Sequence, residues 1–77
     1  MRELLLSMAE GLVDHPEDII IDMDENGGLI QLSLSVNPED VGKVIGKQGK
    51  IANAMRQILK ACAIKENCKV NLEIKEK

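Results

Sequence analysis

The chain has 77 residues, of which 44% are hydrophobic and 30% are charged, and its formal net charge is −3. This balance argues against a disordered chain, and this length leaves room for one small core, so we expect a single domain over residues 1–77. No apolar run approaches the ~18 residues that a membrane span requires, and polar residues interrupt the first segment too soon for a secretory signal. We therefore expect a cytoplasmic protein that does not contact a membrane.

Charge is distributed unevenly along the chain. Residues 1–40 contain ten acidic side chains and one basic side chain, whereas residues 41–77 contain nine basic and three acidic ones. Within residues 41–60 there are five basic side chains and no acidic one. A local positive surface can bind a polyanion although the whole chain is negative. The absence of Phe, Tyr and Trp excludes the aromatic stacking platforms of many single-strand binders, so other groups must contact any nucleic acid.

The first half of the chain predicts one helix and two strands. Apolar residues spaced three and four apart predict an amphipathic helix over about residues 2–13, which ends before Pro16 because proline disfavours a helical residue in front of it. Alternation of apolar and polar residues predicts strands over residues 18–23 and 30–36. Asn26-Gly27-Gly28 between them is a hairpin signal, so the two strands should pair antiparallel.

The second half predicts two helices and a third strand. Asn37-Pro38-Glu39-Asp40 is typical of a helix start, with Asn37 as the cap, and the short helix that follows should end at Gly46. Alternation over residues 69–75 predicts a strand, but the sequence does not indicate which strand lies next to it. The longer helix after the glycine is predicted from an apolar stripe consisting of Ile51, Ala54, Met55, Ile58 and Cys62.

The expected order is therefore α-β-β-α-α-β, an α+β fold with helices on one face of a three-stranded mixed sheet. Met8, Met23 and Met55 lie on apolar stripes and are expected in the core, as is Cys62. The two cysteines lack the spacing of a redox or zinc site, so we expect reduced thiols.

The most informative segment for function lies between the two predicted helices. Gly46 and Gly49 are separated by two polar residues, and glycine lets the backbone turn tightly and lets a ligand approach its N–H groups. Lys43, Lys47 and Lys50 surround this turn with positive charge. The helix that follows presents unpaired N–H groups to an anion. The segment is therefore suited to bind phosphate, such as that of a nucleic-acid backbone.

Two helices joined by a Gly-x-x-Gly turn against a three-stranded sheet resemble the K-homology (KH) domain, which clamps about four nucleotides at that turn. The segment from Val44 to Ile51 is similar to its signature, and strands placed before the helix pair resemble the type II version found in bacteria. The resemblance covers nearly the whole chain. Residues 12–18 and 38–43 are similar to the small bacterial KhpA family, also called YlqC.

The resemblance implies a protein that binds single-stranded RNA at the Gly46–Gly49 turn and acts as an RNA chaperone or post-transcriptional regulator, linked in some bacteria to cell shape and division. The backbone of the turn would face sugar-phosphate, and three apolar side chains would form the floor of a groove under the bases. Without aromatic residues, sequence preference should be weak. The candidate RNA-binding residues are Lys43, Val44, Ile45, Gly46, Lys47, Gln48, Gly49, Lys50 and Ile51.

The alternative function is that of an assembly subunit. The family resemblance implies a homodimer, or a heterodimer with a larger KH protein of the KhpB (Jag) type. Leu6, Ala9 and Val13 are the candidates for an exposed apolar stripe on the first helix, and such a stripe often marks an interface. RNA binding and assembly are compatible.

The sequence predicts no enzyme, cofactor or metal site. We find no nucleophile with a base, and the segment from Gly42 to Lys47 differs from a nucleotide-binding P-loop in its spacing and in having Gln48 in place of the magnesium-binding Ser or Thr. The acidic residues Asp22, Asp24 and Glu25 are better explained as charges that protect a strand edge.

Overall fold

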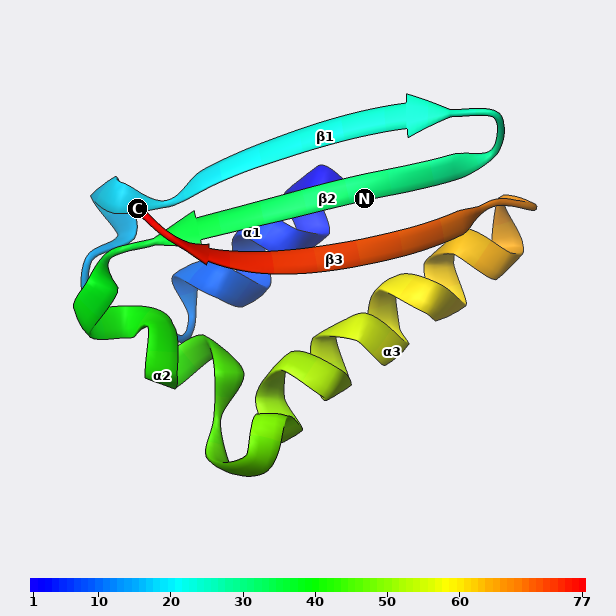
Figure 1. Ribbon diagram of the computed structural model, residues 1–77. Helices are drawn as coiled ribbons and strands as arrows, with labels where there is room; N and C mark the ends of the chain where they lie inside the picture. The colour runs from blue at the N-terminus through cyan, green and yellow to red at the C-terminus, as the bar shows by residue number, and fades with distance from the viewer.

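The computed structural model describes all 77 residues, and its elements follow the expected α-β-β-α-α-β order (Figure 1). The helices and strands are α1 (Arg2–Glu10), β1 (Ile20–Asn26), β2 (Leu29–Val36), α2 (Val41–Ile45), α3 (Lys50–Lys65) and β3 (Lys69–Glu76). Asn37 caps a 3₁₀ turn at Pro38–Asp40 that leads into α2, and its Oδ1 accepts the N–H of Glu39 at 2.8 Å. The predicted cap is confirmed.

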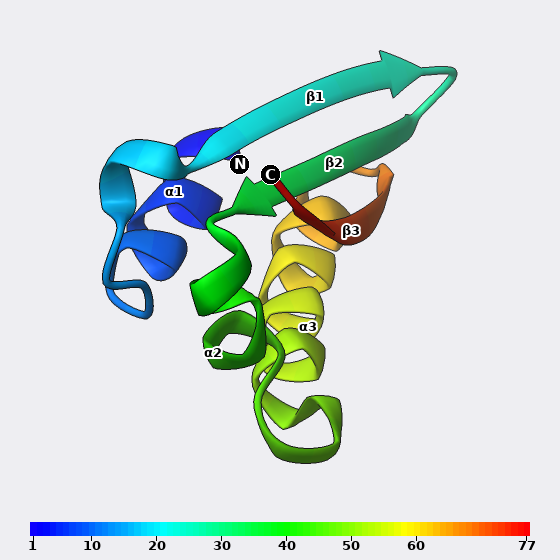
Figure 2. The same cartoon turned by 60° about the vertical axis from the view of Figure 1, so that its left-hand side comes forward.

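The sheet has β2 at its centre. It pairs antiparallel with β1 and parallel with β3, so the strand order that the sequence left open is β1-β2-β3. Alternation along β2 places four residues on one face, all of them buried: Ile30, Leu32, Leu34 and Val36. All three helices lie on that face, and α3 runs beside the edge strand β3 (Figures 1 and 2).

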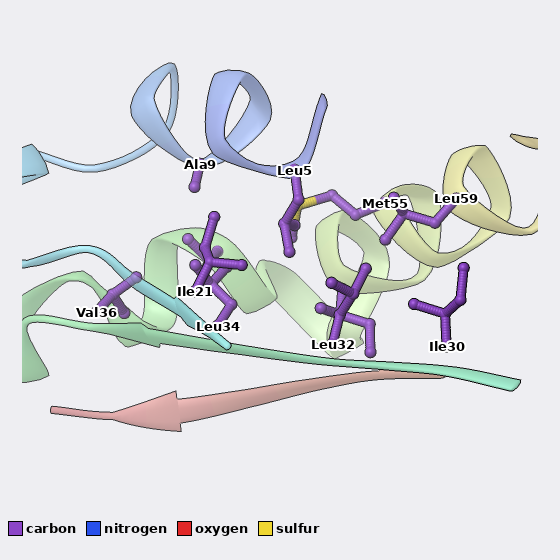
Figure 3. Close-up of a cluster of buried hydrophobic side chains, with 11 residues drawn as sticks. Leu5, Ala9, Ile21, Ile30, Leu32, Leu34, Val36, Met55 and Leu59 are labelled. Atoms are coloured by element: carbon purple, nitrogen blue, oxygen red, sulfur yellow. The ribbon is translucent and has the colours of Figure 1, made fainter. Parts of the chain in front are cut away.

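The core lies between this sheet face and the helices (Figure 3). Leu5 and Ala9 of α1 point to the sheet, and Met55 and Leu59 of α3 lie over the same face beside them. Each fully buried Leu contributes roughly 1.5–3 kcal/mol by its removal from water. Packing of these amphipathic faces, more than helix propensity, stabilises helices as short as α1.

The buried face of α3 differs from the predicted stripe. It consists of Ala52, Met55, Leu59 and Ala63, so of the expected residues only Met55 is fully in the core. Ile58 is 46% exposed, Ala54 is exposed and Cys62 is half-buried. The helix carries more apolar residues than one face can bury, and alanines occupy two of the four buried positions. Spacing alone could not choose between two overlapping stripes.

Two other expectations are corrected at the edges of the fold. Helix α1 ends at Glu10, and Gly11 and Leu12 form a turn in place of the last predicted helical residues. Met23 is 48% exposed although it pairs with Leu32 and so faces the helices. Its strand, β1, is the edge strand away from α3, and Ile21 is the only residue of β1 that is buried.

Candidate nucleic-acid interface

The turn between α2 and α3 depends on backbone conformations that glycine favours. Gly46 ends α2 with φ +76° and ψ 175°, a region open essentially to glycine alone, and Gly49 is left-handed with φ +76° and ψ 14°. Gln48 is also left-handed, with φ +56°. The N–H of Gly49 donates to the carbonyl oxygen of Gly46 at 3.2 Å, which closes the turn. The sequence prediction of a tight glycine turn is confirmed in the structure.

The two central side chains of the turn point outward. Lys47 and Gln48 are exposed, and neither takes part in an ion pair or side-chain hydrogen bond within the chain. Lys50 at the start of α3 is exposed as well. The first N–H groups of α3 and the positive end of its dipole lie at the same place, because Gly49 is the residue immediately before the helix. The turn therefore offers donors and positive charge to an anion.

Lys43, in contrast, is engaged within the fold. Its ammonium group contacts the carboxylate of Asp14 and lies 3.6 Å from Oδ1 of Asp40. The hydrogen bond to Asp14 raises the pKa of Lys43 above its usual value. Asp40 is itself buried and accepts the backbone N–H groups of Asp14 and His15 at 3.2 and 3.0 Å. This cluster joins the segment after α1 to the start of α2.

The three apolar residues expected under the bases are placed differently from one another. Val44 is fully buried in the core, so its side chain is not accessible to a base. Ile45 is half-buried and packs against the core. Ile51 is also half-buried and lies directly beside Gly46. The expected apolar floor of Val44, Ile45 and Ile51 is therefore wrong for Val44, and Ile51 supports the turn from beneath.

A cleft lies between α3 and the edge strand β3. Its volume is about 270 Å³, and its lining residues are Arg56, Leu59, Lys60, Val70, Asn71 and Leu72. The guanidinium of Arg56 crosses from helix to strand: Nε and Nη2 each donate to the carbonyl oxygen of Leu72 at 3.3 Å, and Nη1 donates to Oδ1 of Asn53 at 3.3 Å. A basic helix thus borders a polar strand edge.

None of these cleft residues belongs to the site predicted from the sequence. The sequence pointed to Arg56 and Lys60 only through the run over residues 41–60, which contains basic side chains and no acidic one. Asn71 gave no signal, because its position depends on β3 being the strand next to α3.

Comparison with known proteins matches residues 2–74 to the model of the family described as KhpA/KhpB, KH domain. The chain belongs to this family. RNA-binding protein KhpA of Clostridium perfringens is 54% identical over 74 residues, which cover 96% of this chain and 99% of the relative. The protein of the same name from Listeria monocytogenes is 49% identical over 76 residues, 99% of this chain and 100% of the relative. That of Halalkalibacterium halodurans is 43% identical over 74 residues, 96% and 97% of the two chains.

Membership of the KhpA/KhpB family confirms the expected KH type II fold, with helices on one face of a three-stranded mixed sheet. The relatives carry the name of RNA-binding proteins and not of enzymes, in agreement with the prediction that this KH domain is not an enzyme.

Two further observations concern other classes of function. No helix combines the length and the apolar character needed to cross a bilayer. No three His, Cys, Asp or Glu side chains lie together in a way that would hold a metal ion. Asp22, Asp24 and Glu25 are exposed on the edge strand β1.

Proposed function

We propose that this chain binds single-stranded RNA and that the Gly46–Gly49 turn contacts its sugar-phosphate backbone. The observation that carries the proposal is the geometry of the turn, in which glycine conformations expose Lys47 and Gln48 at the N-terminus of α3. KH domains clamp about four backbone nucleotides at such a turn. The names of the KhpA relatives support the same class of ligand.

Direct contact is assigned to the turn residues and to the first residue of α3. Lys47 and Lys50 supply charge, Gln48 supplies an amide, and Gly46 and Gly49 allow close approach of the backbone. The remaining candidates support the turn: Lys43, although exposed, is held by its ion pairs, and Val44, Ile45 and Ile51 contribute through packing.

From the turn, the strand would continue along the cleft between α3 and β3. Arg56 and Lys60 border this cleft with positive charge. Asn71 also lies in its lining, but its side-chain Nδ2 donates to Oε1 of Gln31 at 3.4 Å. Val70 is half-buried and gives bases an apolar contact. With no aromatic side chain, base contact rests on van der Waals packing and hydrogen bonds, so sequence preference is weak.

Binding of a labelled oligonucleotide across a salt series tests this function. Neutralising ~2–3 phosphates of a single strand gives a log–log salt slope of about −1.5 to −2, at ~0.7 per phosphate. Single strands should bind more tightly than a duplex of the same sequence, because the bases of a duplex are stacked and paired. An affinity that does not change with salt, or equal affinity for both forms, would contradict the proposal.

The cellular role that fits this activity is that of a cytoplasmic RNA chaperone or post-transcriptional regulator, with a link to cell shape and division. Its support is the family resemblance. Crosslinking the protein to RNA in cells and sequencing the bound RNA tests it. Recovery of no RNA above a Lys47→Asp, Gln48→Asp control would count against this role.

A second candidate function, assembly with another KH chain, rests on a shallow groove between α1 and α3. The groove has a volume of about 450 Å³ and includes Met8, Leu12, Ile51, Ala54 and Ile58. Ile58 is 46% exposed and Leu6, nearby in sequence on α1, is 37% exposed. The stripe expected from sequence does not exist as such, since Ala9 is fully buried and Val13 packs against the core.

Light scattering over a concentration series tests self-association, and copurification with a KhpB (Jag) protein tests the heterodimer. A mass that stays near 8.5 kDa and the absence of such a partner would remove this second candidate.

A further inference from the structure

We propose that the cleft between α3 and β3 selects cytosine at one nucleotide of a bound strand, and that Arg56 is the residue that determines this preference. The inference rests on the proposed function, because it names the base that the cleft reads. It is carried by polar groups of three residues that line the cleft: the main-chain carbonyl of Val70, the main-chain N–H of Leu72 and the guanidinium of Arg56.

The hydrogen bonds of β3 indicate which of its main-chain groups face the free edge of the sheet. The N–H of Lys69 donates to the carbonyl oxygen of Gly28 at 2.8 Å, so Lys69 directs its main-chain groups toward β2. This direction alternates along a strand, so Val70 is turned the other way and Leu72, two residues on, is turned the same way as Val70. Because β3 is an edge strand, the N–H and C=O of both residues lack a partner strand. The bond from Arg56 to the carbonyl of Leu72 agrees with this assignment.

Arg56 changes the hydrogen-bonding character of this edge. Its Nε and Nη2 both donate to the carbonyl oxygen of Leu72 at 3.3 Å, so that acceptor is covered. Nη1 donates to Oδ1 of Asn53 at 3.3 Å, which restrains the plane of the guanidinium. A guanidinium has five N–H donors, so one N–H on each Nη remains unused, and the Arg56 side chain is exposed. Where the bare strand would offer an acceptor, the cleft therefore offers a donor.

The polar edge of the cleft then has the order acceptor, donor, donor, contributed by Val70, Leu72 and Arg56. The Watson–Crick edge of cytosine has the complementary order, with an amino donor at N4 followed by the acceptors N3 and O2. Uracil presents acceptor, donor, acceptor, so it opposes like groups at two of the three positions. Adenine lacks the third acceptor, and guanine has the same order as the protein edge. Cytosine is therefore the base that can pair with all three groups.

The preference is confined to one nucleotide. The cleft has a volume of about 270 Å³, and Arg56 is the one arginine among its lining residues. A base that enters the cleft without pairing leaves polar groups without the hydrogen bonds they made to water, which weakens binding. Lys60, the other basic residue of the lining, carries a point charge that attracts phosphate whatever the base. Sequence preference over the whole strand therefore stays weak.

Tetranucleotides, titrated against the intact protein by fluorescence anisotropy near pH 7.5, test the inference, because four nucleotides are about what the turn clamps. Cytosine and uracil have the same size and differ only in their N3 and C4 groups. Wild-type protein should bind tetracytidylate about fivefold more tightly than tetrauridylate. Among four tetrauridylates that each carry cytidine at a different position, one should match tetracytidylate and three should match tetrauridylate. A gain spread evenly over the four positions would overturn the assignment to one nucleotide.

Arg56→Ala uncovers the carbonyl of Leu72 and removes the third donor, so the two tetramers should bind within about twofold of each other. Lys60→Ala is the matched control, since it removes the same charge from the same cleft: it should weaken both tetramers and keep the ratio at about fivefold. The ratio compares two ligands on one protein, so partial unfolding of a variant does not alter it. Equal affinity of the wild type for the two tetramers, or a ratio that survives Arg56→Ala, would overturn the inference and leave binding at the turn intact. Failure of the wild type to bind any tetramer would overturn both.

Discussion

Ile51 occupies the space into which a side chain at Gly46 would project. A Cβ built on Gly46 would lie 2.7 Å from Cγ1 of Ile51, closer than real contacts allow. Gly46 is therefore required for two reasons, its backbone conformation and the isoleucine packed against it. Gly49 differs, because the nearest atom to its Cβ position is Nδ2 of Asn53 at 3.9 Å.

The two glycines should therefore differ in their tolerance of alanine. Gly46→Ala should lower the free energy of unfolding by about 3 kcal/mol or more, since backbone strain of roughly 1–3 kcal/mol adds to an overpacking cost of similar size. Gly49→Ala should cost only about 1–2 kcal/mol, the penalty of a left-handed conformation. Urea denaturation measures both. Equal losses would show that Ile51 moves aside freely.

The buried face of α3 predicts that substitutions at two consecutive residues, Ile58 and Leu59, differ in their effect on stability. Leu59→Ala should lower the free energy of unfolding by about 2–5 kcal/mol, because Leu59 is fully buried. Ile58→Ala should cost less than about 1 kcal/mol, because nearly half of Ile58 already contacts solvent. A larger loss for Ile58→Ala than for Leu59→Ala, measured by urea denaturation, would contradict this orientation of the helix.

Asp40 should make stability depend on pH on the acidic side. Burial by itself raises the pKa of this carboxyl, but the N–H groups of Asp14 and His15 and the charges of His15 and Lys43 outweigh it, so the pKa lies below its usual value of 3.8. Because the unfolded chain then takes up the proton first, the stabilisation is present above about pH 3.8 and is lost as the pH falls through the lower, folded pKa.

Asp40→Asn tests this dependence, since its amide cannot ionise. Thermal unfolding between pH 2 and pH 7 should show a lower Tm than wild type near neutral pH and a shallower fall on acidification. Asp18→Asn is a useful comparison, because hydrogen bonds from Lys77 and Asn37 also lower the pKa of Asp18. If Asp40→Asn and wild type lose stability in parallel as the pH falls, Asp40 is not the group responsible.

Lys43 and Lys47 should separate stability from RNA binding. Lys47→Gln removes an exposed charge at the turn, so it should weaken RNA binding and reduce the salt slope by about 0.7 without changing Tm. Lys43→Gln breaks the contacts with Asp14 and Asp40, so it should lower Tm and leave the salt slope nearly unchanged. A reduced slope for Lys43→Gln would show that this lysine leaves its carboxylates to bind phosphate.

Local patterns were sufficient for most of the fold. Alternation in β2, the cap at Asn37 and the conformational freedom of Gly46 act over a few residues, and each was correctly predicted from the sequence. The strand order was not accessible, because the parallel pairing of β2 with β3 joins segments about forty residues apart. The buried face of α3 depends on the same long-range packing.

The candidate site also combines local features, which the sequence indicated, with long-range contacts, which it did not. The turn is local, and its exposed residues were found by their spacing. The pairing of Lys43 with Asp14 and the position of Arg56 beside Leu72 are contacts between distant segments, so the local sequence could not indicate either contact. Lys43, which was included in the predicted site, contacts two carboxylates, whereas Arg56, which was omitted, lines the cleft.

The most direct test of the proposed site at the Gly46–Gly49 turn is RNA binding by the Lys47→Asp, Gln48→Asp variant. Both side chains are exposed, so the free energy of unfolding should change by less than ~0.5 kcal/mol, while two negative charges replace one positive charge beside the expected phosphates. Gln57→Asp, Lys65→Asp makes the same change of charge on exposed residues of α3 that do not line the cleft. The turn variant should stay folded and lose single-stranded RNA binding, while the control variant should retain it. Full RNA affinity in a well-folded turn variant would contradict the proposed site.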